Sequence, residues 1–160
     1  YPLNQTVAEI NLDGANLWGA TDDIIVHGEE RSGLGDYVRP HAAQLGLTLK
    51  PDAEPEKGFF FRSDHFPFAK AGIPSLWIEH GRDYRGRPEG WGDDLQADYT
   101  ANRYHAPSDE FTEEFVFDGA VQQGTLMLRV LLELADDDTW PNWYADQEFK
   151  AARDAMLENR

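Results

Sequence analysis

The stretch RSDHFPFAKAGIPSLWIEHG, residues 62–81, decides the fold. Ser63 and Asp64 are good N-cap residues for a short helix, which Gly72 then closes. The run IPSLWIEHG (73–81) that follows is largely apolar, as is typical of a strand buried inside a parallel or mixed sheet. This part of the chain therefore predicts a loop, a short helix and a buried strand.

The flanking sequence adds further elements of both kinds. Helical spacing is clear at 34–46 and strongest at 117–136, although Pro40 predicts a kink or a later start in the first of these. Residues 81–104 are rich in Gly, Arg, Asp and aromatic residues, and we expect a long loop that is functional or partly disordered. Strands are predicted at 6–13, 23–28, 47–52 and 73–81, and helices at 34–46, 64–72, 117–136 and 140–160. Alternating strands and helices predict an α/β sandwich, here one domain over residues 1–160.

The composition excludes several classes of partner and site. The chain has 160 residues, 30 acidic against 14 basic, and a net charge of −16, which argues against nucleic acid and membranes as partners. It contains no cysteine, so any metal must be held by His, Asp and Glu. It starts at Tyr1 and not at Met, so we expect a mature product or a piece of a longer chain.

The consecutive residues Ser63, Asp64 and His65 do not form a nucleophilic triad. Neighbouring side chains point in different directions on a strand or a helix, and triad members normally come from separate parts of a chain. No G-x-S-x-G turn is present to expose a serine.

Two other segments contain candidate metal ligands. Asp13 in NLDGAN (11–16) ends an apolar strand, where α/β proteins place ligands, although Asp13 and Gly14 also suit a simple turn. His105 in RYHAPSDEF (103–111) follows the polar loop and is a possible imidazole ligand or an ordinary surface histidine. Spacing alone favours the simpler alternative in each case. The other histidines, at 27, 41, 65 and 80, are expected to be structural.

Taken together, three segments resemble one family. NLDGAN (11–16), EPEKGFFFRSDHFPFAKAGIPSLWIEHG (54–81) and YHAPSDEF (104–111) look like the C-terminal half of the catalytic domain of the M28 zinc aminopeptidases, which are dinuclear metallopeptidases. The likeness runs over about the whole chain. DYTANRYHAPSDEF (98–111) is close to a bacterial branch whose longer chains carry an exported catalytic domain, which implies a periplasmic or secreted protein.

The resemblance implies a three-layer α/β/α sandwich around a mixed sheet. It also implies a peptide substrate and two zinc ions that share a bridging hydroxide. By motif position, Asp13 resembles the carboxylate ligand of one metal and His105 the imidazole ligand of the other. Tyr104 resembles the tyrosine that steadies the oxyanion of the tetrahedral intermediate. The segment before the short helix matches a wall of the substrate pocket, which assigns Phe61, Ser63 and Asp64 to that wall.

The family's remaining ligands and its general base precede the N-x-D motif, and no match to them lies in this chain. GEERSGLG (28–35) resembles the family's Glu-Glu motif but comes after N-x-D, so we expect Glu29 and Glu30 to be solvated. One matched ligand per metal is too few, because a catalytic zinc takes about three. We therefore expect little metal binding and no activity from this chain alone. We also expect it to pair with its missing N-terminal half or with itself.

Three alternatives remain open at this point. The same fold could serve as a non-catalytic receptor or interaction domain, or as a single-zinc glutaminyl cyclase. Without the resemblance, the sequence describes an acidic α/β domain that binds a small cationic ligand through residues 82–104.

Overall fold

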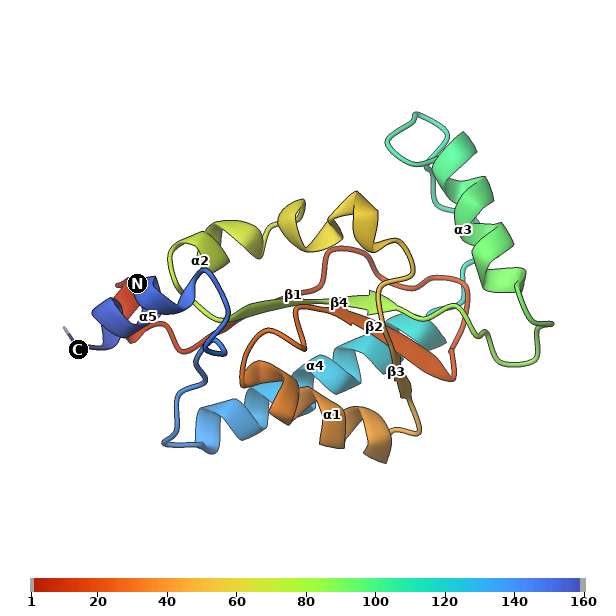
Figure 1. Cartoon of the computed structure of the whole chain (residues 1–160). Helices are drawn as coiled ribbons and strands as arrows, with labels where there is room; N and C mark the ends of the chain where they lie inside the picture. Colours follow the sequence, from red (N-terminus) through yellow and green to blue (C-terminus); the bar gives the residue numbers. More distant parts are fainter. Residues whose placement is uncertain (1, 159–160) are drawn as a thin grey trace.

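Most of the run 73–81 forms one of the two inner strands of a four-stranded mixed sheet (Figure 1). In the computed structural model, which describes residues 2–158, the strand order is β1-β4-β2-β3. Strand β4 runs parallel to β1 and antiparallel to β2, and β2 runs parallel to β3. The four strands are β1 (Glu9–Asn11), β2 (Asp23–His27), β3 (Thr48–Lys50) and β4 (Ser75–His80). The α/β class and the mixed sheet are thus confirmed.

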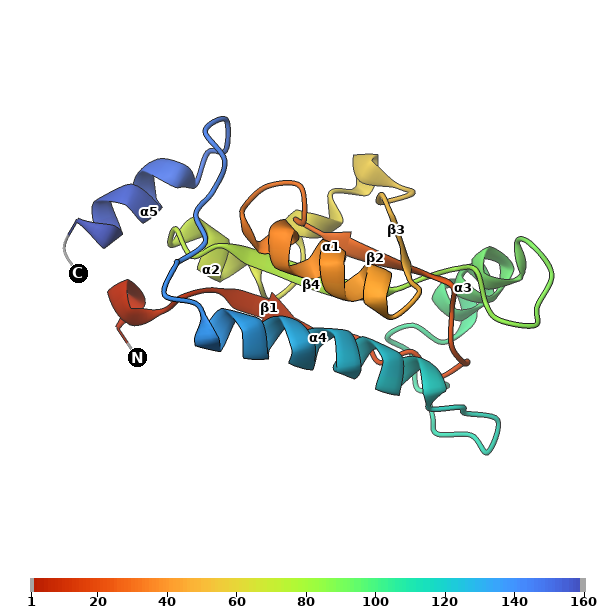
Figure 2. The same cartoon turned by 90° about the horizontal axis from the view of Figure 1, so that it is seen from below.

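Two helices, α1 (Leu34–Gln44) and α4 (Asp118–Asp136), cover one face of the sheet and lie side by side (Figure 2). Their buried faces follow the helical spacing of the sequence, with Val38 on α1 and Leu126 and Val130 on α4 fully buried. These side chains pack against Leu76 and Ile78 of β4, which are also fully buried. Burial of this apolar surface is the main stabilising term of the fold.

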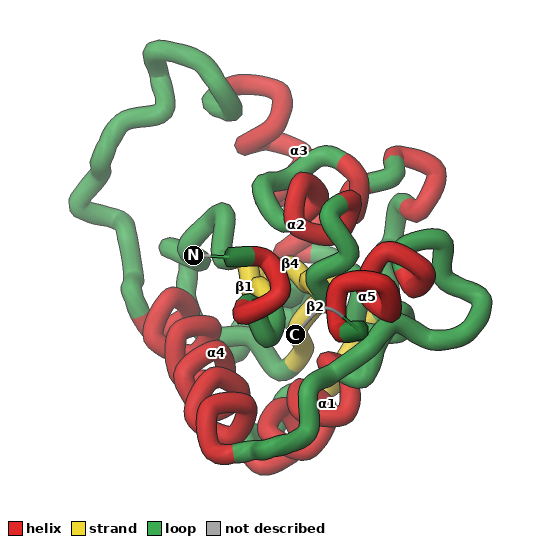
Figure 3. Tube along the Cα trace, turned by 90° about the vertical axis from the view of Figure 1, so that its left-hand side faces the viewer, coloured by secondary structure: helices red, strands yellow, loops and turns green. Residues whose placement is uncertain are grey.

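The opposite face carries shorter elements. These are the 3-10 turns η2 (Pro55–Lys57) and η3 (Phe59–Phe61) and the helix α2 (Phe66–Lys70). Figure 3 shows α2 on the other side of the strands from α1 and α4. Phe60 and Ala69 form a second buried cluster with Trp143 and Phe149. Because one short helix and turns form this layer, the full three-layer sandwich stays a prediction.

The two ends of the sheet are closed by different elements. At one end, η1 (Leu3–Gln5) lies near α5 (Lys150–Leu157), and at the other end α3 (Trp91–Asn102) projects from the sheet (Figure 1). Arg153 of α5 is fully buried and donates to the main-chain oxygens of Thr6 and Val7 at 3.0 and 2.7 Å. Among residues 2–158 no helix has the length and apolarity needed to cross a bilayer.

The predicted loop over 81–104 was wrong, because α3 occupies twelve of its residues. Its only buried residue is Gly92, so no apolar periodicity indicates the helix in the sequence. The predicted helix over 140–160 was too long, since Lys150–Leu157 is the only helical part of the described residues 140–158. Upstream of it, Trp143 is buried in an irregular segment and its indole N–H donates to the Gly72 carbonyl at 2.9 Å.

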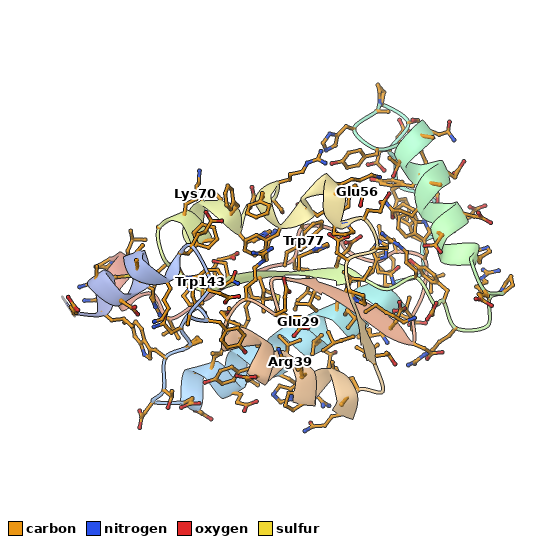
Figure 4. The ribbon with its side chains drawn as sticks, viewed as in Figure 1. Glu29, Arg39, Glu56, Lys70, Trp77 and Trp143 are labelled. Carbon is orange, nitrogen blue, oxygen red and sulfur yellow. The ribbon has the colours of Figure 1, made fainter. Side chains whose placement is uncertain are left out.

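Several local expectations are also corrected. Helix α1 starts at Leu34 and continues through Pro40, so the later start is wrong, whereas the kink stays a prediction. Helix α2 begins at Phe66 with His65 at its N-cap position and no side-chain cap, and the Ser63 hydroxyl instead donates to Asp13. Arg39 of α1 and Glu29, both labelled in Figure 4, form an ion pair of 2.9 Å, so Glu29 is not simply solvated. The strands predicted at 6–13 and 47–52 are shorter, with bounds Glu9–Asn11 and Thr48–Lys50.

Candidate functional site

The alternation of β1 directs two motif residues to one face of the sheet. Ile10 packs against the main core, so its neighbour Asn11 points to the opposite face, where α2 lies. Asp13 follows just beyond the end of β1. The segment of the S-D-H motif crosses this face immediately before α2. Two stretches about fifty residues apart in the sequence therefore meet at the end of β1.

A chain of two hydrogen bonds joins these stretches. The Asn11 side-chain amide donates to Ser63 Oγ at 2.7 Å, and the Ser63 hydroxyl donates to Asp13 Oδ2 at 2.9 Å. The serine thus acts as acceptor and donor at once. It orients the exposed Asp13 carboxyl group through Oδ2, and it leaves the Oδ1 oxygen outside the chain of bonds.

The surroundings of Asp13 are acidic, and one histidine is buried below them. Burial, together with the Asp64 charge, raises the pKa of Glu9 from 4.5 to about 7. Burial also lowers the pKa of His65 from 6.5 to about 4, although the charges of Asp13 and Asp64 act in the opposite direction. His65 has no exposed surface, and its ring lies 4.8 Å from that of Phe60. The histidine is therefore neutral at pH 7, and its ring packs in the interior beside that of Phe60.

The other candidate pair lies just beyond α3. The rings of Tyr104 and His105 stack with centroids 3.9 Å apart, and both side chains are exposed. His105 has φ of 57°, the only positive φ of a non-glycine residue among those described. This left-handed backbone is unfavourable for a side chain with a Cβ, and such residues cluster at functional sites.

Phe61 lies in a third environment. Its ring is 42% exposed, contacts Phe60 edge-to-face at 5.3 Å and has the Arg31 guanidinium 5.4 Å above it. It lines a pocket of about 380 Å³, whose wall also includes His27, Asp52, Phe59 and Phe60. Ser63 and Asp64 are not part of this wall, so the grouping of all three as one substrate pocket stays a prediction.

A family model described as Peptidase family M28 matches residues 1–128. The chain belongs to this family. The match covers all three motif segments, from NLDGAN to YHAPSDEF. Searches among curated proteins and among solved structures each returned no match. Membership assigns this M28 chain to the peptidases, which are hydrolases, and the family is generally metal-dependent.

The metal donors of this M28 chain do not complete a metal site by themselves. Asp13 and His105 offer a carboxylate oxygen and an imidazole nitrogen, which are donor types that zinc takes. Within residues 2–158, however, no group of three or more His, Asp or Glu side chains could hold a metal ion. The donor set alone therefore does not fit zinc. The assignment of these two residues as metal ligands stays a prediction.

The sequence did not indicate the residues that connect the region around Asp13 with the Tyr104–His105 pair. Asn16 is 1% exposed, and its side-chain oxygen accepts from the Trp18 main chain and from the Tyr84 hydroxyl, each at 3.1 Å. The Trp18 ring contacts Tyr99 of α3 edge-to-face at 5.4 Å. The only signal in the sequence was the unusual density of aromatic residues around the motifs, and it does not say which rings meet.

Proposed function

We propose that this M28 chain is part of a zinc-dependent exopeptidase of the aminopeptidase type, to which it contributes Asp13, Tyr104 and His105. The observation that supports this best is the hydrogen-bond chain from Asn11 through Ser63 to Asp13. It joins two family motifs at the end of a sheet strand, where α/β proteins bind ligands.

Each residue has a separate proposed role. The Ser63 hydroxyl keeps the Asp13 carboxylate oriented for ligation. The exposed Tyr104 hydroxyl is the donor proposed for the oxyanion that develops on the scissile carbonyl, an interaction that is worth roughly 3 kcal/mol where it is well aligned. The carboxylates of Asp13 and Asp64 favour a substrate with a free, positively charged amino group.

Zinc belongs to this proposal only for the complete enzyme. Two ions would each need further ligands from outside the described residues, and such ions supply hydroxide near neutral pH. We therefore propose that this chain alone is inactive and that activity needs the missing N-terminal half. An exported, periplasmic or secreted, enzyme is part of the same proposal, and it rests on the family branch alone.

The surface of this chain suits such a partner. Helix α4 is buried along one side, but Val121, Leu128 and Leu132 on its outer side are 56–65% exposed. Strand β1, beside it, pairs only with β4 and so has one open edge. An apolar helix face next to an open strand edge fits an added strand and helix. We propose the N-terminal half as the occupant, because two copies with a net charge of −16 each repel one another.

The test uses leucine p-nitroanilide as substrate, with this chain alone and with the chain co-expressed with its upstream coding segment in the presence of zinc. We expect hydrolysis only from the complex. Asp13→Asn should lower kcat/KM by more than the roughly 10–100-fold that is typical when only a partner of a metal ligand is lost. The exposed Asp138→Asn serves as the matched control and should have no effect. Full activity of the Asp13→Asn complex would refute the assignment.

A non-catalytic interaction domain is the second candidate. It is favoured by the absence of a three-ligand group within residues 2–158. Three results together would support this candidate over the peptidase. The complex would bind no stoichiometric zinc, would hydrolyse no aminoacyl anilide, and would still assemble tightly through α4. Leu128→Asp should then abolish assembly, which sedimentation velocity measures directly.

A further inference from the structure

A series of ring contacts leads from the loop after Asp13 to the Tyr104–His105 pair. Trp18 lies five residues beyond Asp13, and its ring contacts His80 at 5.7 Å and Tyr99 at 5.4 Å, both edge-to-face. Tyr99 in turn contacts the ring of Tyr104 at 6.1 Å. Such edge-to-face pairs are attractive beyond their burial and have a defined geometry.

The first member of the series is held firmly. The buried Asn16 accepts from the Trp18 main chain, and its own N–H donates to Gln123 Oε1 of α4 at 2.7 Å. A Cβ on Gly119 of α4 would collide with the Asn16 side chain at 2.3 Å, so helix and loop are in close contact. Trp18 is thus attached to the body of the domain.

Tyr99 is the point where the turn after α3 is held. Its hydroxyl donates to Asp109 Oδ2 at 2.8 Å, on the far side of the turn. Its main-chain oxygen accepts from the N–H groups of Arg103 and Tyr104, each at 2.9 Å. One residue therefore contacts the turn before and after the Tyr104–His105 pair.

The other attachments of α3 lie toward its start, where the Trp91 ring contacts that of Tyr84 at 5.0 Å and Gln96 accepts from Arg82 at 3.3 Å. Gly92 is its only buried residue, and the helix projects from the end of the sheet (Figure 1). Beyond the turn, the chain returns to the same loop, where the Val116 N–H donates to the Leu17 oxygen at 2.8 Å. Leu17 and Trp18 therefore contact the segment 99–116, here called the excursion, on both sides of the Tyr104–His105 pair.

We propose that Trp18 and Tyr99 are positioning residues, whose ring contact sets the location of the Tyr104–His105 pair relative to Asp13. Neither residue is assigned a contact with substrate. The structural part of this inference stands on the contacts alone, whereas its consequence for turnover rests on the proposed function.

The experiment measures the location directly. Because the chain has no cysteine, the exposed Ala15 and Ala101 can be replaced by cysteine and carry two nitroxide labels as the only ones present. Pulsed electron–electron double resonance on the 160-residue chain should give a narrow distribution of the distance between the two nitroxide labels. Tyr99→Leu should broaden it at least twofold, because the ring contact with Trp18 is lost. Tyr99→Phe keeps the ring and should leave the distribution narrow.

Two controls keep the test decisive. Phe111→Leu alters a 74% exposed ring that contacts Phe115 in the same excursion, and it should leave the distribution narrow. Thermal unfolding is recorded for each variant, and Trp18→Leu is a second disruption from the opposite side of the contact. Narrow distributions in folded Tyr99→Leu and Trp18→Leu would overturn the proposal.

Activity of the co-expressed complex separates this inference from the proposed function. Tyr99→Leu should lower kcat by roughly 100-fold with little change in KM, since misplacement of about 1 Å can cost that much, and Tyr99→Phe should restore most of the rate. If no complex hydrolyses peptide but the distances broaden as expected, the proposed function fails and the positioning role stands. If the complex is active and Tyr99→Leu changes neither kcat nor the distances, the positioning role fails.

Discussion

His65 and Glu9 should make the stability of this chain depend on pH in opposite directions. His65 is fully buried, with a pKa lowered to about 4 in the folded protein, against 6.5 in the unfolded chain. Between these values the unfolded chain binds a proton that the folded protein excludes, so stability rises with pH. The contribution of His65 is fully present above pH 6.5 and is lost as the pH falls toward 4.

Glu9 has the opposite sign. Its pKa is raised to about 7 in the folded protein, from 4.5, so the folded protein holds a proton that the unfolded chain releases. The contribution of Glu9 is fully present below pH 4.5 and is lost as the pH rises toward 7. At about 1.4 kcal/mol per pH unit, each group changes the free energy of unfolding by about 2 kcal/mol between pH 5.0 and 7.0. The value for Glu9 should be smaller, because solvent reaches part of its side chain.

The assay is urea unfolding followed by the fluorescence of the five tryptophans, at several pH values from 5.0 to 7.0. His65→Phe keeps an aromatic ring beside Phe60, and only the pH dependence of its difference from wild type is interpreted. The wild-type advantage over His65→Phe should grow by about 2 kcal/mol from pH 5.0 to 7.0. The difference in the free energy of unfolding between wild type and Glu9→Gln should decrease from pH 5.0 to 7.0. A difference that stays constant with pH for His65→Phe would refute the burial of a neutral imidazole.

Three further predictions concern packing and the candidate site. Ile78→Ala, in the central strand, should cost about 2–5 kcal/mol in urea unfolding, whereas Leu128→Ala on the exposed side of α4 should stay within about 0.5 kcal/mol. Arg153→Met removes the guanidinium donors to the Thr6 and Val7 carbonyls and should cost about 3 kcal/mol, with faster hydrogen exchange in residues 3–8. Ser63→Ala should change stability by no more than about 1 kcal/mol, but it should lower kcat/KM of the co-expressed complex by roughly 10-fold, because the Asp13 carboxylate loses its donor. Equal losses of activity in Ser63→Ala and in an exposed control such as Asp138→Asn would contradict that role.

The core elements could be predicted from the sequence because their signals are local. The apolar run at 73–81 contains β4, whose residues Leu76 and Ile78 are fully buried, and the helical spacing of α1 and α4 matches their buried sides. The motifs that contain Asp13, Ser63 and His105 could also be recognised in the sequence, because they occur in the order that the family has. Local pattern and order were sufficient for the α/β class, which the structure confirms, and for the family, which the match over residues 1–128 confirms.

The tertiary structure decided what depends on partners distant in the sequence. The local pattern predicts a helix cap at Ser63, but its hydroxyl donates to Asp13, fifty positions away, and no local pattern contains that preference. Helix α3 lacks apolar periodicity, and its ring contact with Trp18 across some eighty residues is invisible in the sequence. Trp143 lies in a segment with a helical sequence pattern that is not helical in the structure, and its indole N–H donates to the Gly72 carbonyl. Local propensities differ by less than about 1 kcal/mol per residue, so one buried long-range contact is enough to override them.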